Sequence, residues 1–123
     1  MTEKAEFANH IVDLMEDFGR VEAKRMFGGF GIFHEGLMIG LIADGSFYLK
    51  ADEQTRELFL EQGSTPFTYQ KQDKEFSLSY YLAPESFFEE SDEIKHWARL
   101  AYDAALRVPR KPEKKKKSSA KLS

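Results

Sequence analysis

Apolar residues recur at helical spacing near the start of the chain. They fall on one face of a helix at Phe7, Ile11, Leu14, Met15 and Phe18. Gly19 follows directly, at the position where a glycine commonly caps the C-terminal end of a helix. The pattern therefore predicts a first helix that ends at about Phe18.

Short runs of strand-forming residues come next. The runs cover residues 21–27, 30–33, 37–42 and 47–50, and turn-forming triplets separate the later ones at His34-Glu35-Gly36 and Asp44-Gly45-Ser46. Connections this short cannot hold the crossover that parallel strands require. We therefore expect three antiparallel strands in meander order.

A short helix and a second hairpin are predicted after these strands. Asp52 is placed as the N-cap of a helix that carries Thr55, Leu58 and Phe59 and is closed by Gly63. Residues 66–70 and 76–82 then form two strands around the wholly polar link 71–75.

The last predicted element is a helix that begins at Ser91. Its apolar face consists of Ile94, Trp97, Ala101, Ala104 and Val108. The resulting order is helix, three strands, helix, two strands, helix. It predicts an α+β domain in which helices pack on an antiparallel sheet in two layers.

Charge divides the chain into two parts. The formal net charge of −3 combines 10 basic and 20 acidic residues in 1–106 with 8 basic and 1 acidic residue in 107–123. The segment 109–123 offers only Ala120 and Leu122 as apolar side chains, too few to order it by burial. We therefore expect a folded domain over residues 1–108 and a disordered, lysine-rich tail over 109–123.

Composition narrows the class of protein. A chain of 123 residues has room for one hydrophobic core, and the absence of Cys excludes disulfides, thiol nucleophiles and cysteine-ligated metals. No apolar run is long enough to span a bilayer, and Glu3 and Glu6 do not fit a signal peptide. We expect a cytoplasmic protein without a membrane partner.

Residues typical of catalysis or metal binding are sparse. The histidines are His10, His34 and His96, and the one spacing typical of metal ligands is Glu93 with His96. This single pair reads better as a solvated helical face, and His34 as an exposed turn residue. We therefore expect no metal, no cofactor and no catalytic residues.

The glycine-rich segment 28–31 does not fit a phosphate-binding loop. It lacks the Gly-Lys-Ser/Thr of a P-loop and leads into a strand instead of a helix. We expect these glycines to mark a strand bend or bulge where backbone passes close to a neighbour.

The tail has an obvious class of partner. Its basic residues could release counterions from a nucleic acid backbone, without reading sequence. These candidates are Arg110, Lys111, Lys114, Lys115, Lys116, Lys117 and Lys121. Contact with the acidic body of the chain and simple solubilisation are the alternatives.

Several motifs resemble those of one family. Residues 25–33 (RMFGGFGIF) and 36–52 (GLMIGLIADGSFYLKAD) closely resemble the N-terminal domain of the TfoX/Sxy competence regulators. Further matching positions are Arg56, Phe59, Gly63, Pro66, Phe67, Tyr69, Tyr80, Tyr81, Pro84, Trp97, Ala98, Ala101 and Ala104. The resemblance covers about residues 3–107.

The resemblance implies a fold like that of the secretion chaperones, with the order α-β3-α-β2-α, which commonly associates as homodimers. Full-length members of the family promote DNA-uptake genes together with the cyclic-AMP receptor protein. They carry a second, helical domain where this chain has its lysine-rich tail. The family supplies no catalytic residues.

Two classes of function follow. The first is a bacterial regulatory or adaptor domain whose body holds a protein partner or a second copy of itself while the tail touches nucleic acid. The second is a small-molecule- or protein-binding domain without a nucleic acid role, using a sheet face or cleft near Arg25, Tyr48 and Lys50. We expect a non-enzyme in either case.

Overall fold

The computed structural model describes residues 2–26, 28–71 and 74–108. The helices are α1 (Thr2–Leu14), α2 (Arg56–Glu61) and α3 (Ser91–Arg107), with short 3-10 turns at Met15–Asp17 and Glu85–Phe88. The strands are β1 (Glu22–Met26), β2 (Gly29–His34), β3 (Leu37–Ala43), β4 (Ser46–Lys50), β5 (Pro66–Lys71) and β6 (Lys74–Leu82). The predicted disordered tail, 109–123, lies outside the described residues.

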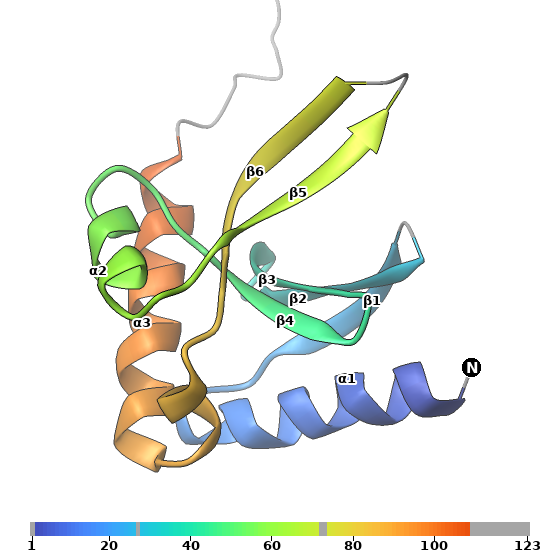
Figure 1. The fold of residues 1–123 in the computed structure, drawn as a ribbon. Helices are drawn as coiled ribbons and strands as arrows, with labels where there is room; N and C mark the ends of the chain where they lie inside the picture. The colour runs from blue at the N-terminus through green and yellow to red at the C-terminus, as the bar shows by residue number, and fades with distance from the viewer. Residues whose placement is uncertain (1, 27, 72–73, 109–123) are drawn as a thin grey trace, which may run out of the picture.

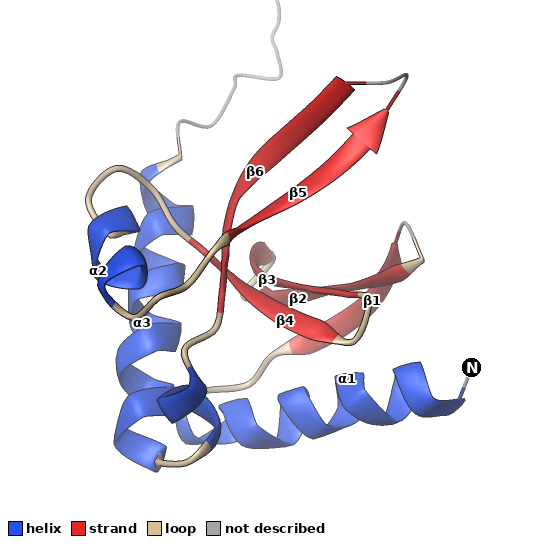
Figure 2. Cartoon of the chain, in the orientation of Figure 1, coloured by secondary structure: helices blue, strands red, loops and turns tan. Residues whose placement is uncertain are grey.

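The strands form one antiparallel sheet in the order β1-β2-β3-β4-β6-β5, which confirms the predicted α+β fold (Figure 2). The prediction of three strands before α2 is wrong, because the structure has four. The first two runs are the separate strands β1 and β2, which pair as a hairpin. Gly28 adopts a φ of 77° between them and lets the chain reverse.

The turns at residues 34–36 and 44–46 confirm the predicted hairpins. Glu35 and Gly36 have φ values of 51° and 84°, and Asp44 and Gly45 have values of 52° and 77°. Two successive left-handed residues are typical of the type I′ turn, whose twist matches that of the flanking strands. Local turn chemistry therefore sets the register of β3 with β4, and that of β2 with β3 as far as Phe33, beyond which the pairing shifts by one residue.

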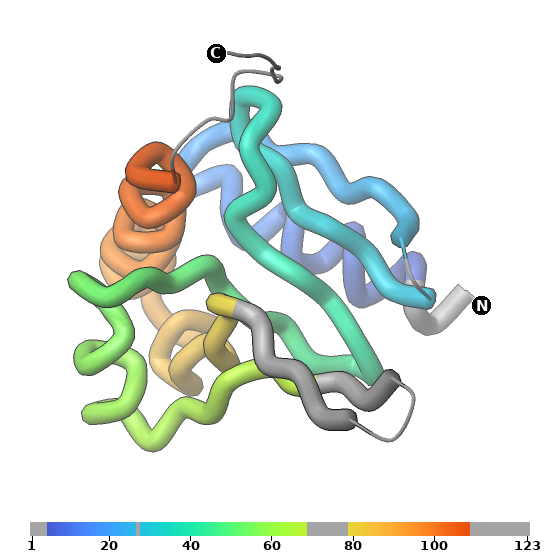
Figure 3. Tube along the Cα trace, turned by 90° about the horizontal axis from the view of Figure 1, so that it is seen from above, coloured from blue at the N-terminus to red at the C-terminus, as the bar shows by residue number. Residues whose placement is uncertain are grey.

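All three helices lie on one side of the sheet. Figure 1 shows α1 beneath β1–β4, whereas the β5–β6 end of the sheet extends upward, away from α1. Seen from above in Figure 3, α3 flanks the strands with α2 beside it. Between helices and sheet lies the core, in which Phe47, Phe59 and Phe87 are fully buried. None of the helices in the described part of the chain is long and apolar enough to cross a membrane.

The helix ends differ from the prediction in three places. Gly19 is not left-handed, and α1 instead ends in a 3-10 turn in which the Phe18 amide donates to the Met15 carbonyl (2.8 Å). Val108 is 44% exposed, because the buried face of α3 ends at Ala105. The regular helix α2 begins at Arg56, four residues after Asp52.

Candidate functional site

Asp52 organises the turn that leads into α2. Its Oδ1 accepts hydrogen bonds from the amides of Gln54 (3.0 Å) and Thr55 (3.2 Å). In return, the Asp52 amide donates to Thr55 Oγ1 (3.0 Å). This reciprocal pattern resembles a capping box, so the expected capping role of Asp52 is carried out one turn ahead of the regular helix.

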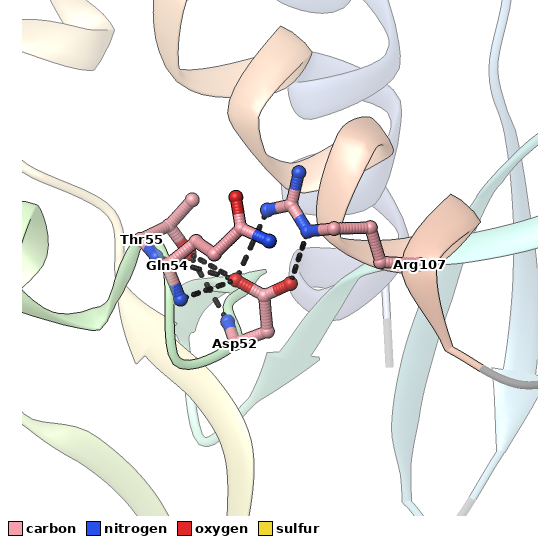
Figure 4. Close-up of polar contacts among 4 residues, drawn as sticks. All are labelled: Asp52, Gln54, Thr55 and Arg107. Carbon is pink, nitrogen blue, oxygen red and sulfur yellow. Dashed lines mark hydrogen bonds and ion pairs between the residues drawn. The ribbon is translucent and has the colours of Figure 1, made fainter.

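The same carboxylate holds the last residue of α3 (Figure 4). Arg107 Nε donates to Asp52 Oδ2 (2.6 Å) and Arg107 Nη2 donates to Asp52 Oδ1 (3.0 Å). The hydrogen bond from Arg107 is the main reason why the pKa of Asp52 lies below its ordinary value. The ion pair ties the C-terminal end of α3 to the β4–α2 connection. The lysine-rich segment of the sequence begins two residues later.

Tyr48 and Lys50 lie on the sheet face opposite the helices, here called the open face. They alternate along β4 with Phe47 and Leu49, which are buried in the core. The Tyr48 ring packs edge-on against Phe67, with centroids 5.2 Å apart.

Lys50 is half-buried on this face. Its Nζ lies 5.2 Å from the centroid of the Tyr80 ring. Burial lowers the pKa of Lys50 below its ordinary value, and the nearby Asp52 carboxylate opposes this shift only in part. The ammonium group is therefore held in a partly desolvated, aromatic environment.

Arg25 lies on the other side of the sheet. It pairs with Phe30 in the β1–β2 register, and its guanidinium lies 5.3 Å from the Phe30 ring centroid. Phe30 belongs to the core between sheet and helices. Cross-strand partners share a face, so Arg25 does not join Tyr48 and Lys50 in one cleft. The three candidate ligand-binding residues thus form two separate environments.

The glycine-rich segment supports close backbone packing. A Cβ at Gly29 would overlap the carbonyl oxygen of Ile42 on β3. Gly28, Gly29 and Phe30 also line a pocket of about 260 Å³ together with Phe7, Ile42, Asp44 and Gly45. The charged side chain among these residues is an aspartate, so the pocket does not suit a phosphate. The close backbone approach predicted for these glycines is confirmed at Gly29, whereas Gly28 faces open space and Gly31 meets side chains.

Three side chains of the open face converge above Gly31. A Cβ at Gly31 would lie 2.6 Å from Met26 Sδ, 2.9 Å from Phe33 Cε1 and 3.4 Å from Met38 Sδ. We call Met26, Phe33 and Met38 the methionine patch. All three side chains are half-buried. Sequence reasoning missed this cluster because its members come from three strands.

His34 is not the exposed turn residue that the sequence suggests. Its side chain is 14% exposed and lies between the rings of Phe18 and Tyr102, with centroids 4.9 and 4.8 Å away. His34 Nδ1 lies 2.7 Å from the Arg20 carbonyl oxygen, so this nitrogen carries the hydrogen. The imidazole, on β2, therefore joins the segment between α1 and β1 to α3.

Within the Glu93 and His96 pair, the Glu93 carboxylate holds two neighbouring side chains. Glu93 Oε1 accepts hydrogen bonds from Ser86 Oγ and Trp97 Nε1, both 3.0 Å long. Among the described residues, no group of three His, Asp or Glu side chains could hold a metal ion. Glu93 instead connects the start of α3 with the preceding 3-10 turn.

The seven tail candidates, Arg110 to Lys121, lie outside the described residues. Arg107, which shortly precedes them in the sequence, is described and forms its ion pair with Asp52.

Comparison with known proteins places the chain in a family. It matches the TfoX N-terminal domain over residues 13–105. It is 24% identical to Protein Sxy of Escherichia coli over 95 residues, which are 77% of this chain and 46% of that protein. It is 27% identical to DNA transformation protein TfoX1 of Aliivibrio fischeri over 85 residues, which are 69% of this chain and 41% of that protein. The chain thus spans less than half the length of these two curated relatives. Because the family match covers most of its residues, the chain belongs to the TfoX N-terminal domain family.

Proposed function

We propose that this chain is a non-enzymatic, cytoplasmic regulatory domain in which the folded body holds a protein partner and the basic tail contacts nucleic acid. The observation that carries the proposal is the family match over residues 13–105 together with the strongly basic segment that follows the matched part. One relative is named a DNA transformation protein. A role in regulating DNA uptake or transcription fits that name.

The charge distribution determines which part would touch nucleic acid. Residues 1–106 hold twice as many acidic as basic side chains, so the body as a whole repels a phosphate backbone. Residues 107–123 hold 8 basic and 1 acidic side chain. Affinity for nucleic acid should therefore depend on the tail and fall steeply with salt.

The anchored end of α3 supports a defined geometry for such a contact. The ion pair between Asp52 and Arg107 fixes the last turn of the helix against the β4–α2 connection. The tail would then leave the body at one place, and nucleic acid bound by it would stay close to the C-terminal end of α3.

A matched pair of variants tests the role of the tail. In the tail variant, Lys114, Lys115, Lys116 and Lys117 are replaced by Gln. In the body variant, the same number of exposed positive charges is removed at Lys24, Arg25, Arg56 and Lys95. Binding of a fluorescent DNA duplex is followed by anisotropy at low salt. We expect the tail variant to lose at least about tenfold in affinity while the body variant stays close to the wild type.

Equal losses in the two variants, or no binding by any of the proteins, would contradict the nucleic acid role of the tail. The runner-up would then be a protein-binding domain without a nucleic acid role, which the methionine patch favours. Light scattering on the same samples would show whether the chain is a homodimer.

A further inference from the structure

The methionine patch is apolar surface that the fold of this chain leaves half-open. The helices pack on the other face of the sheet: α1 contacts β1 and β2, and α3 contacts β3 and β4. Gly31 has no side chain of its own at the centre of the patch, so the two thioethers and the Phe33 ring close over its backbone. Such side chains can rearrange to fit another surface, because Met is unbranched and polarizable.

Other parts of the open face are covered by the chain itself. Tyr80 extends from β6 to β3, where its hydroxyl donates to the Met38 carbonyl oxygen (3.4 Å). Tyr80 and Leu41 are 9% and 6% exposed. Met26, Phe33 and Met38 are more exposed than either, although they share the same face. Among the described residues, therefore, the side chains that bury Leu41 and Tyr80 do not cover the methionine patch to the same extent.

Basic side chains lie beside the patch, together with carboxylates. Lys24 Nζ lies 4.9 Å from the Phe33 ring centroid, and Lys50 lies on the same face. Arg20 and Lys24 line a pocket with Phe33. Within the described part of the chain, Arg20, Lys24 and Lys50 form no ion pair. The neighbouring carboxylates are Glu22, on the open face of β1, and Glu35, which accepts a hydrogen bond from Tyr102. Asp52 is near Lys50 but forms its ion pair with Arg107.

We propose that the methionine patch docks an amphipathic segment of a partner protein, whose apolar side chains are flanked by Asp or Glu. The apolar side chains would displace water from Met26, Phe33 and Met38, and the carboxylates would pair with Lys24 and Arg20. The inference rests on the part of the proposed function in which the body holds a protein partner.

The charges disfavour the chain's own tail as the occupant of the patch. Residues 107–123 are strongly basic and would meet Lys24, Arg20 and Lys50 with charge of the same sign. A second copy of the chain remains as a competing occupant, and its effect on molecular mass separates it from a peptide partner.

The test begins with selection of binders to the full-length protein from a random peptide library. The strongest peptide is then synthesised, and its affinity is measured for the wild type and for the double variant Met26→Gln, Met38→Gln. These substitutions keep the length of the side chains. The double variant Leu58→Gln, Leu60→Gln, which changes exposed apolar residues of α2, is the matched control.

We expect the selected peptides to combine apolar residues with Asp or Glu. Affinity should fall at least tenfold in the patch variant and stay within twofold in the α2 variant. The variant Lys24→Glu should weaken binding severalfold, whereas Lys95→Glu on α3 should not. Lys24→Glu decides the matter even if the patch variant does not fold.

The proposal is overturned if no peptide is enriched, if the peptides carry basic residues, or if the patch variants bind them as well as the wild type. It is also overturned if the patch variant converts a dimer into a monomer, because a second copy would then cover the patch. DNA binding by the same variants is expected to be unchanged. Loss of DNA binding in the tail variant alone would leave the tail proposal standing even if peptide docking fails.

Discussion

Asp52 and Arg107 stand 55 residues apart in the sequence and meet in a two-pronged ion pair. Arg107 Nε and Nη2 donate to different oxygens of the carboxylate, the geometry in which Arg binds carboxylates best. Asp52 also caps the turn before α2, so one side chain orders that turn and the end of α3. The tail of the sequence therefore follows a fixed point of the fold.

The variant Asp52→Asn should be less stable than the wild type at neutral pH. The pKa of Asp52 is lowered in the folded state, so its charge stabilises the fold above the ordinary value of 3.8. That contribution disappears as the pH falls through the lowered pKa, because wild-type Asp52 is then uncharged as well. Urea unfolding at a series of pH values from 7 downward follows the narrowing of the difference. A gap that is the same at all these pH values, or that is matched by the control Glu61→Gln, would refute the role of the ion pair.

The variant Gly29→Ala should cost far more stability than Gly28→Ala. A Cβ at Gly29 would overlap the backbone carbonyl of Ile42, so β2 and β3 would have to move apart, at about 3 kcal/mol. At Gly28 there is open space, and only the left-handed φ of 77° is strained, at about 1 kcal/mol. Denaturant unfolding of both variants ranks them. The reverse order would mean that the strands are not packed as described.

The variant His34→Ala should destabilise the fold by about 2–3 kcal/mol. It removes a mostly buried ring between Phe18 and Tyr102 and the hydrogen bond to the Arg20 carbonyl. His10→Ala, at an exposed position of α1, should stay within about 0.5 kcal/mol of the wild type. Equal losses of stability in the two variants would show that the contacts of His34 do not stabilise the fold.

Tyr80 should ionise at unusually high pH. Burial raises the pKa of Tyr80 to about 12. The folded state binds its proton more tightly than the unfolded chain, so stability should fall as the pH rises above 10, the ordinary value. A spectrophotometric titration of the wild type and Tyr80→Phe detects the late step. Ionisation of all five tyrosines near the ordinary value would show that Tyr80 is exposed.

Local chemistry made part of the fold predictable. Asp44-Gly45 and Glu35-Gly36 mark turns because their left-handed conformations favour glycine and polar residues. Gly63, with a φ of 81°, closes α2 for the same reason. The count of strands failed because Gly28 could be read either as a bend within one strand or as a turn between two.

Long-range relationships were not predictable from the sequence. Gly19 looks like a helix cap, yet a Cβ there would lie 3.1 Å from Cε1 of His34, and the ring belongs to another element. Arg25 and Lys50 lie on opposite faces of the sheet. Which face each residue takes depends on the register of three strand pairs, β1–β2, β2–β3 and β3–β4. The methionine patch and the ion pair of Arg107 likewise join residues from separate elements. Spacing along the chain carries none of this information.

The salt dependence of DNA binding tests the central claim most directly. Anisotropy titrations of the wild type, the tail variant and the body variant at several salt concentrations give the slope of log affinity against log salt. If the four replaced lysines each neutralise a phosphate, the slope of the tail variant should be shallower by about 3 to 4, and the body variant should keep the wild-type slope. Parallel slopes for the wild type and the tail variant would contradict the claim that the tail holds nucleic acid.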